Sequence, residues 1–168
     1  GGGDSVSVSA IASADASGAT FTWDTSFGDG ATITEGVGTW KVGVGNWNDA
    51  GVNRAWANGK YAIFGGGTAG TAGTITLGGN VTPGSMTCNA PNAGTYTIDL
   101  NGYTLSVPTS YGSINGTSPT VIKDTLGTGA LVMQAGNEIF NSTDLSIEAK
   151  ITGGYDVRAI NKQLILSN

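Results

Sequence analysis

Side chains suited to nucleophilic or metal chemistry are scarce in this chain, which excludes several classes of enzyme. The sequence contains no His and a single Cys, Cys88. Ser-His-Asp and Cys-His catalysis, His metal ligands and His proton shuttles are therefore excluded. One cysteine forms neither an internal disulfide nor a cysteine-cluster metal site. Cys88 alternates with polar neighbours and has no nearby cation to activate it, so we expect a small buried core residue.

Carboxylates offer the remaining acid–base chemistry, but no pair is singled out. A glycosidase needs two carboxylates facing each other across a cleft. Asp124 with Asp144, or Glu138 with Asp156, are candidates without a distinguishing pattern. A polysaccharide lyase would instead need a basic groove, and the seven Lys and Arg residues are scattered along the chain. We therefore expect no catalytic activity and no cofactor.

Three acidic residues of the first third of the chain could bind Ca²⁺ through oxygen atoms: Asp24, Asp29 and Glu35. Their spacing matches no EF-hand loop, and each lies among Gly, Ser or Thr residues typical of turns. We expect turn residues here and no metal site.

The aromatic residues offer a possible sugar-binding platform. Trp47 and Trp56 are accompanied by polar residues such as Asn48 and Asp49, which could hydrogen-bond sugar hydroxyls while the indole faces stack on the rings. The competing interpretation is a structural cap, because bulky aromatic side chains efficiently cover the apolar end of a stacked repeat. The cap is the interpretation we favour. A further feature is three N-glycosylation sequons, at Asn80, Asn115 and Asn141, which would be acceptors in a host that glycosylates secreted proteins.

Composition defines the kind of chain that positions these residues. The 168 residues suit one domain, and 29 of them are Gly. Hydrophobic residues make up 39% and charged residues 11%, which is unlike a disordered chain. The net charge of −5 argues against nucleic acid and anionic membrane surfaces as partners. No apolar run approaches the ~20 residues of a membrane-spanning helix.

The chain divides into three parts. Residues 1–20 are small and polar, with Val6 and Val8 alternating with Ser in a strand-like pattern that has no local partner. Residues 21–67 contain all four Trp and many turn residues, and form the expected cap. Residues 68–168 consist of short alternating segments separated by Gly and Asn turns, such as Thr74–Leu77, Thr95–Leu100 and Leu145–Ala149.

This pattern predicts an all-β fold whose segments each bury one face. Segments starting roughly ten residues apart are compatible with a sandwich, a barrel or a β-solenoid. We favour a parallel β-solenoid because several segments look too short for a sandwich, and keep the β-sandwich as the alternative. The alternation predicts that one set of side chains points inward: Ile75, Leu77, Met86, Cys88, Tyr96, Ile98, Leu105, Leu145, Ile147, Leu164 and Leu166.

Two stretches resemble a known repeat family. Asp144–Gly154 followed by Lys162–Asn168 resembles the autotransporter-associated β-strand repeat, with its Ile-Thr-Gly turn and Leu-Ile-Leu-Ser strand. Trp47–Ala50, Ala62–Gly66 and Gly73–Thr82 look like the segment that often precedes such repeats. The resemblance implies a right-handed β-helix in a large secreted or surface-exposed bacterial protein, often adhesive or structural. Here the family pattern stops after Leu-Ile-Leu-Ser, without the Asn-Thr-Tyr-x-Gly continuation.

We therefore expect an extracellular or cell-surface structural module whose main partner is itself. The uncovered strand near Leu164 and Leu166 and the strand-like run at Val6 and Val8 suggest head-to-tail stacking into a filament. A carbohydrate-binding or adhesive module using the Trp-rich segment, with a surface polysaccharide as partner, is the alternative. A polysaccharide-processing β-helix is a third possibility that we favour less.

Overall fold

The computed structural model describes residues 18–107, 114–134, 138–140, 144–154, 158–160 and 164–167. Within these ranges the protein consists of short strands joined by turns and has no helix. In particular, the described part has no helix of the length and apolarity needed to cross a membrane. Thr, Val, Ile and aromatic residues fill the strands, whereas Gly, Asn and Asp lie at their ends, as local preferences dictate. The expected all-β class is confirmed.

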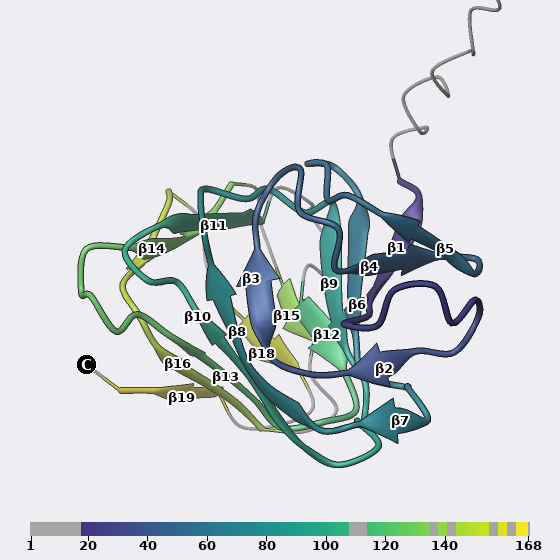
Figure 1. The fold of residues 1–168 in the computed structure, drawn as a ribbon. Coiled ribbons are helices and arrows are strands. Elements are labelled where there is room, and N and C mark those ends of the chain that lie inside the picture. Colours follow the sequence, from purple (N-terminus) through teal and green to yellow (C-terminus); the bar gives the residue numbers. More distant parts are fainter. Residues whose placement is uncertain are drawn as a thin grey trace, which may run out of the picture.

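The described strands form four sheets (Figure 1). The largest has eight strands in the spatial order β18 (Arg158–Ile160), β15 (Glu138–Phe140), β12 (Ile114–Gly116), β9 (Ser85–Cys88), β6 (Tyr61–Phe64), β1 (Thr20–Trp23), β4 (Trp47–Asp49) and β5 (Val52–Arg54). The second has six, β19 (Leu164–Leu166), β16 (Leu145–Glu148), β13 (Thr120–Lys123), β10 (Gly94–Asp99), β8 (Ala72–Leu77) and β3 (Gly38–Trp40). The two small sheets are β11 (Thr104–Val107), β14 (Ala130–Met133) and β17 (Ile151–Thr152), and β2 (Thr34–Glu35) with β7 (Ala69–Gly70).

Consecutive strands of the chain are distributed in rotation over the three larger sheets. From β9 onward, each triplet such as β9, β10 and β11 places one strand in each sheet, and the next triplet pairs with it in parallel. In Figure 1 the six-stranded sheet accordingly runs from the blue β3 through teal and green strands to the yellow β19. A sandwich of antiparallel sheets fits this pairing poorly, because antiparallel pairing is confined to the β1–β4–β5 end of the eight-stranded sheet.

Side chains of one kind align across the parallel strands and form the core. In the six-stranded sheet Ile75, Ile98, Ile122 and Ile147 occupy equivalent positions of β8, β10, β13 and β16, and all four are buried. Their outward neighbours are largely polar. Nine of the eleven side chains predicted to point inward are confirmed as buried: Ile75, Leu77, Met86, Cys88, Tyr96, Ile98, Leu105, Leu145 and Ile147.

Leu166 corrects the predicted core list. It is paired with Ile147, at the end of the isoleucine row, yet its side chain is 62% exposed. The reason is that β19 is the edge of its sheet, and no described strand lies beyond it to cover the side chain. The side chain of Leu164 lies outside the described residues.

The three predicted segments relate to the sheets as follows. Residues 1–17, including Val6 and Val8, lie outside the described residues. The sheets run across the expected boundary at residue 67, because β6 pairs with β9 and β3 pairs with β8. The Trp-rich segment therefore shares its sheets with the repeating strands and adds the antiparallel pair β4–β5 to one end.

Part of the high Gly content is explained by close contacts at the corners between strands. Gly70 has φ of 78°, and a Cβ atom there would lie 2.0 Å from the carbonyl oxygen of Glu35. Gly94 repeats the arrangement against the carbonyl oxygen of Ala72, at 2.4 Å. Only glycine tolerates both the backbone conformation and the contact.

Candidate functional site

A cluster of buried aromatic rings fills the core between β1, β3, β4 and β6. Ring centroids lie 4.5 Å apart for Trp47 and Trp56, 5.0 Å for Trp40 and Trp56, and 5.3 Å for Trp23 and Trp47. Phe64 of β6 lies 5.4 Å from Trp47. The alternation along β1 and β6 directs these rings inward, where such edge-to-face and tilted contacts stabilise the packing.

The predicted sugar platform on Trp47 and Trp56 is therefore wrong in that form. The two residues are 0% and 1% exposed, so neither indole presents a face to solvent. Asn48 is also buried, and its amide is fully used. Nδ2 donates to Asp24 Oδ2 and the Gly30 carbonyl, and Oδ1 accepts the Gly51 N–H. Asp49 faces Arg54 with its Oδ2 3.4 Å from Nε.

A shallow groove of about 530 Å³ does lie on the outer side of β1 and β4. Thr20, Thr22 and Asp49 are among its polar lining residues, together with Asn48. Its other lining residues are small or aliphatic, and no aromatic residue lines it. The groove offers hydroxyls and one carboxylate without a stacking surface.

Two of the three acidic residues considered as Ca²⁺ ligands, Asp24 and Glu35, hydrogen-bond to the protein's own backbone. Asp24 is fully buried, and its Oδ1 accepts the N–H groups of Ser26 and Thr34, both at 3.1 Å. Glu35 is buried as well, with its two oxygens accepting from Gly67 N (2.8 Å) and Asn92 N (2.7 Å). These carboxylates satisfy backbone donors of loops that strand pairing leaves unpaired. The described residues contain no group of three or more metal-binding side chains.

Of the carboxylates considered for catalysis, that of Asp124 holds a corner together. Asp124 accepts the N–H of Gly102 through Oδ1 and that of Gly129 through Oδ2. Asp144 is exposed, with its backbone carbonyl accepting from Thr120 N. Asp156 and the side chain of Glu138 lie outside the described residues.

Asp99 lies at a corner beside Asp124. Burial alone would raise the pKa of Asp99, but hydrogen bonds from the hydroxyl and N–H of Thr125 and from the N–H of Asn101, with Lys123 nearby, outweigh it and lower the pKa below its ordinary value. Lys123 Nζ lies 3.9 Å from Asp99 Oδ2. The charged carboxylate thus joins the turn after β10 to the turn after β13.

Cys88 is the buried core residue that its pattern predicted. Burial raises the pKa of the thiol to about 11, against a smaller opposing effect of a hydrogen bond with Thr120. At neutral pH the side chain is therefore a protonated thiol and a poor nucleophile. Burial likewise raises the pKa of Tyr96, and the nearby Glu35 raises it further.

Of the three sequons, Asn80 can be placed in detail. Asn80 is exposed, and its Oδ1 accepts the N–H of Thr104 at 2.9 Å. Asn58 makes the equivalent bond, in which its Oδ1 accepts the N–H of Thr82 at 2.9 Å. In both bonds the donor residue follows the Asn by 24 positions in the chain. The Asn80 side chain therefore links neighbouring strand levels. Asn141 and the side chain of Asn115 lie outside the described residues.

Exposed apolar side chains gather at the two opposite edges of the larger sheets. We call the edge formed by β3 and β5 the leading end. Val37 and Val42 flank β3, and Val52 lies in β5. Each of the three side chains is about half exposed or more. Phe27 is 64% exposed and lies near Gly45 and the Arg54 backbone of the same end.

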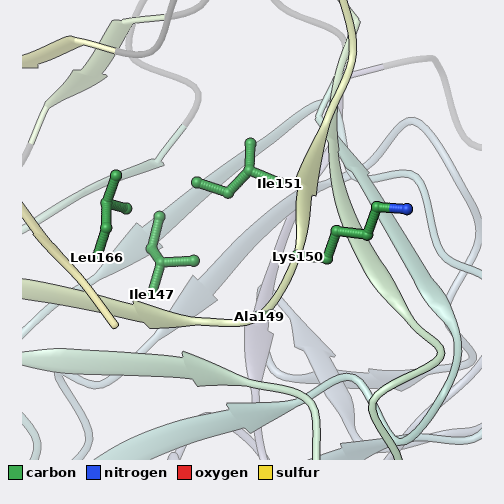
Figure 2. A pocket seen from close by; sticks show the side chains of 5 residues that line it. All are labelled: Ile147, Ala149, Lys150, Ile151 and Leu166. Carbon is green, nitrogen blue, oxygen red and sulfur yellow. The ribbon is translucent and has the colours of Figure 1, made fainter. Parts of the chain in front are cut away.

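We call the edge formed by β17, β18 and β19 the trailing end. A cavity of about 310 Å³ opens there, lined by Ile147, Ala149, Lys150, Ile151 and Leu166. Figure 2 shows Ile147, Ile151 and Leu166 directed toward the same space, whereas the Lys150 side chain points away. Ile165 is also exposed on β19. Within the described residues, the trailing end thus combines outer strand edges that pair with no further strand and core side chains that are exposed.

The sequence indicated only part of these two surfaces. Leu166 was selected for self-association from its place in the last alternating segment. Phe27, Val37, Val42 and Val52 were missed, because an isolated apolar residue among Gly and Asp has no pattern that marks exposure. Ile151 was missed because its aliphatic side chain reads as ordinary core. Only the strand order shows that these residues lie at edges.

Comparison with known proteins adds no assignment to this geometry. No protein-family model, curated protein or solved structure matches the chain.

Proposed function

We propose that this protein is a non-catalytic structural module that associates end to end. In this proposal the parallel sheets are the faces of a β-solenoid in which each turn of about 24 residues adds one level. The rotation of consecutive strands over three sheets supports it, as does the alignment of equivalent residues 23 to 25 positions apart. In this proposal, the resemblance to autotransporter-associated repeats implies that the solenoid coils right-handedly and that the protein is extracellular or on the cell surface.

The observation that carries the proposed function is where the exposed apolar residues lie. Among the residues whose exposure the structure describes, six of the nine large exposed hydrophobic residues belong to the two ends: Phe27, Val37, Val42, Val52, Ile165 and Leu166. Free strand edges with apolar side chains favour pairing with another chain. Because the leading and trailing ends differ, their contact is heterologous and does not close into a dimer. Repeated contacts of this kind give a filament.

Leu166 and Leu126 provide a matched test, because each is 62% exposed and only Leu166 lies at an end. We expect the purified protein to associate with rising concentration in light scattering and to form elongated particles in electron microscopy. Leu166→Asp should shift association to at least about tenfold higher concentration, since it places a charge in an apolar contact. Leu126→Asp should leave association unchanged.

A protein that stays monomeric at millimolar concentration would contradict the proposed function. So would equal effects of the two substitutions, because they would show that added charge alone, rather than the trailing end, controls association.

A further inference from the structure

An exposed tyrosine lies in the middle of the eight-stranded sheet, away from both ends. Tyr61 begins β6, which pairs with β1 on one side and with β9 on the other (Figure 1). The next residue, Ala62, is buried, so Tyr61 points outward, and it is 42% exposed. Its partners on the neighbouring strands are Thr20 and Ser85, which also point outward. An exposed aromatic ring is therefore flanked by a hydroxyl group on each side.

Two glycines allow the Tyr61 ring to lie flat on the sheet. A Cβ atom at Gly84 would lie 2.8 Å from the ring atom Cε1, and one at Gly18 would lie 3.6 Å from Cε2. One edge of the ring thus faces Gly84, and the opposite edge faces Gly18. A ring whose two edges point toward the neighbouring strands turns one face to the sheet and the other to solvent. A side chain at Gly84 would displace the ring from this position.

The hydroxyl groups around this ring are available to a ligand. The next row of the same face consists of Thr22, Ile63 and Thr87, again one residue from each of the three strands. Within the part of the chain that the structure describes, the hydroxyls of Thr20, Thr22, Ser85 and Thr87 form no hydrogen bond with the protein. The face thus combines a stacking surface with unused donors and acceptors.

The groove on the outer side of β1 and β4 continues this surface. Thr20 and Thr22 line the groove, and neighbouring strands such as β1 and β6 lie about 4.8 Å apart. Among the described lining residues, Asp49 is the single charged one, and its carboxylate lies beside Arg54. The outward residues of β1, β6 and β9 are uncharged. This distribution of charge favours a neutral ligand.

We propose that this face binds a neutral oligosaccharide, with one sugar ring stacked on Tyr61 and the next unit in the groove beside Thr20 and Thr22. The C–H face of a pyranose is apolar and covers an aromatic ring, while its hydroxyls reach polar groups at the rim. A β-1,4-linked chain such as cellohexaose or chitohexaose is flat, as this face is. The inference goes beyond the proposed end-to-end association and does not depend on it, because β6 lies inside its sheet.

Tyr61 and Tyr103 form a matched pair for the test. They are 42% and 39% exposed, and Tyr103 lies outside this face, directly before β11. Binding of cellohexaose and chitohexaose to the full chain is followed by saturation-transfer-difference NMR, at a protein concentration too low for association. We expect at least one of them to bind with Kd of about 1 mM or below. Tyr61→Ala should weaken this binding at least about tenfold, whereas Tyr103→Ala should leave it unchanged.

Two further variants separate stacking from a general effect on folding. Tyr61→Phe keeps the ring and should retain the Kd within about threefold. Thr20→Val removes one hydroxyl at nearly constant volume and should weaken binding about three- to tenfold. Because Thr20→Val leaves Tyr61 in place, it tests the site even where Tyr61→Ala fails to melt cooperatively by circular dichroism.

Three results would overturn the proposal. The first is that neither oligosaccharide binds at about 5 mM. The second is that Tyr61→Ala binds as the unchanged protein does, or that Tyr103→Ala weakens binding equally. The third is equal binding of hexagalacturonate, which carries a carboxylate on every unit, because the uncharged face should select a neutral chain. None of these results bears on end-to-end association, which Leu166→Asp tests separately.

Discussion

At the scale of single residues, buried or partly buried carboxylates replace missing strand hydrogen bonds. Asp24, Glu35, Asp99 and Asp124 each accept two or more backbone N–H groups from loops. Such bonds to a charged acceptor contribute more than neutral ones, about 1.5–3 kcal/mol each. Several of the few acidic residues in this chain therefore have a structural role.

Asp99→Asn tests this role through its pH dependence. The pKa of Asp99 is lowered in the folded protein, so its contribution to the free energy of unfolding is complete above the unfolded-state pKa near 3.8 and is lost as pH falls through the lower folded-state value. We expect the substitution to reduce the free energy of unfolding by about 1–2 kcal/mol at pH 7, measured by urea unfolding. The difference from the unchanged protein should shrink below about pH 4.

Asp144→Asn is the control, because Asp144 is exposed. It should change the free energy of unfolding little at any pH. An Asp99→Asn effect that stayed constant from pH 7 to pH 3 would show that the charge of Asp99 is not what stabilises the corner.

At the scale of elements, each short strand is stable only through its neighbours. A four-residue strand such as β13 is bounded by β10 and β16, and its inward Ile122 continues the row formed by Ile98 and Ile147. Register therefore decides which side chains are buried, since a slip of one residue would move every side chain to the other face.

Ile98→Asp tests the register. Ile98 is fully buried, whereas the preceding Thr97 lies on the outward side of β10 and is partly exposed. An unpaired carboxylate at position 98 should prevent folding, because its desolvation exceeds the stability of a domain of this size. Thr97→Asp should fold and melt cooperatively within a few degrees of the unchanged protein by circular dichroism. A soluble Ile98→Asp protein with a cooperative transition would contradict the register.

At the scale of the whole molecule, the two ends differ in how they are finished. The leading end carries the β4–β5 pair over a cluster of Trp rings. The trailing end has an open cavity, the exposed Leu166 and strands that pair with no further strand of the described ranges. Because each strand pairs only with the strands beside it in its sheet, we expect local stability to follow this asymmetry.

Hydrogen exchange measured at a concentration too low for association should reveal a gradient. We expect the strongest protection in β8, β10 and β13, intermediate protection in β4, and the weakest in β17 and β19, because few apolar contacts cover those two edges. At high concentration the protection of β17 and β19 should rise selectively. Protection that was weakest in β4 and β5 would show that the leading end, not the trailing end, is the less stable one.

The class of fold and most of the core could be predicted from residue order alone. Alternation of apolar and polar residues has a period of two, which only a half-buried strand satisfies, so the inward positions of β8, β10 and β16 could be read directly. The absence of His and the single Cys in the chain excluded several kinds of chemistry without any structure. These features depend on residue type and local order alone.

Alternation does not show which strands have a neighbour on each side. That information comes only from the tertiary structure. The sequence allowed Trp47 and Trp56 to form an exposed sugar-binding platform. In the structure they are buried, because the β4–β5 pairing and the contacts of β1 and β6 enclose them. Leu166 has the pattern of a core residue and is exposed, because exposure depends on whether another strand lies beyond β19. Whether a side chain at a sheet edge is buried depends on pairing between segments far apart in the chain. The local sequence therefore does not predict it.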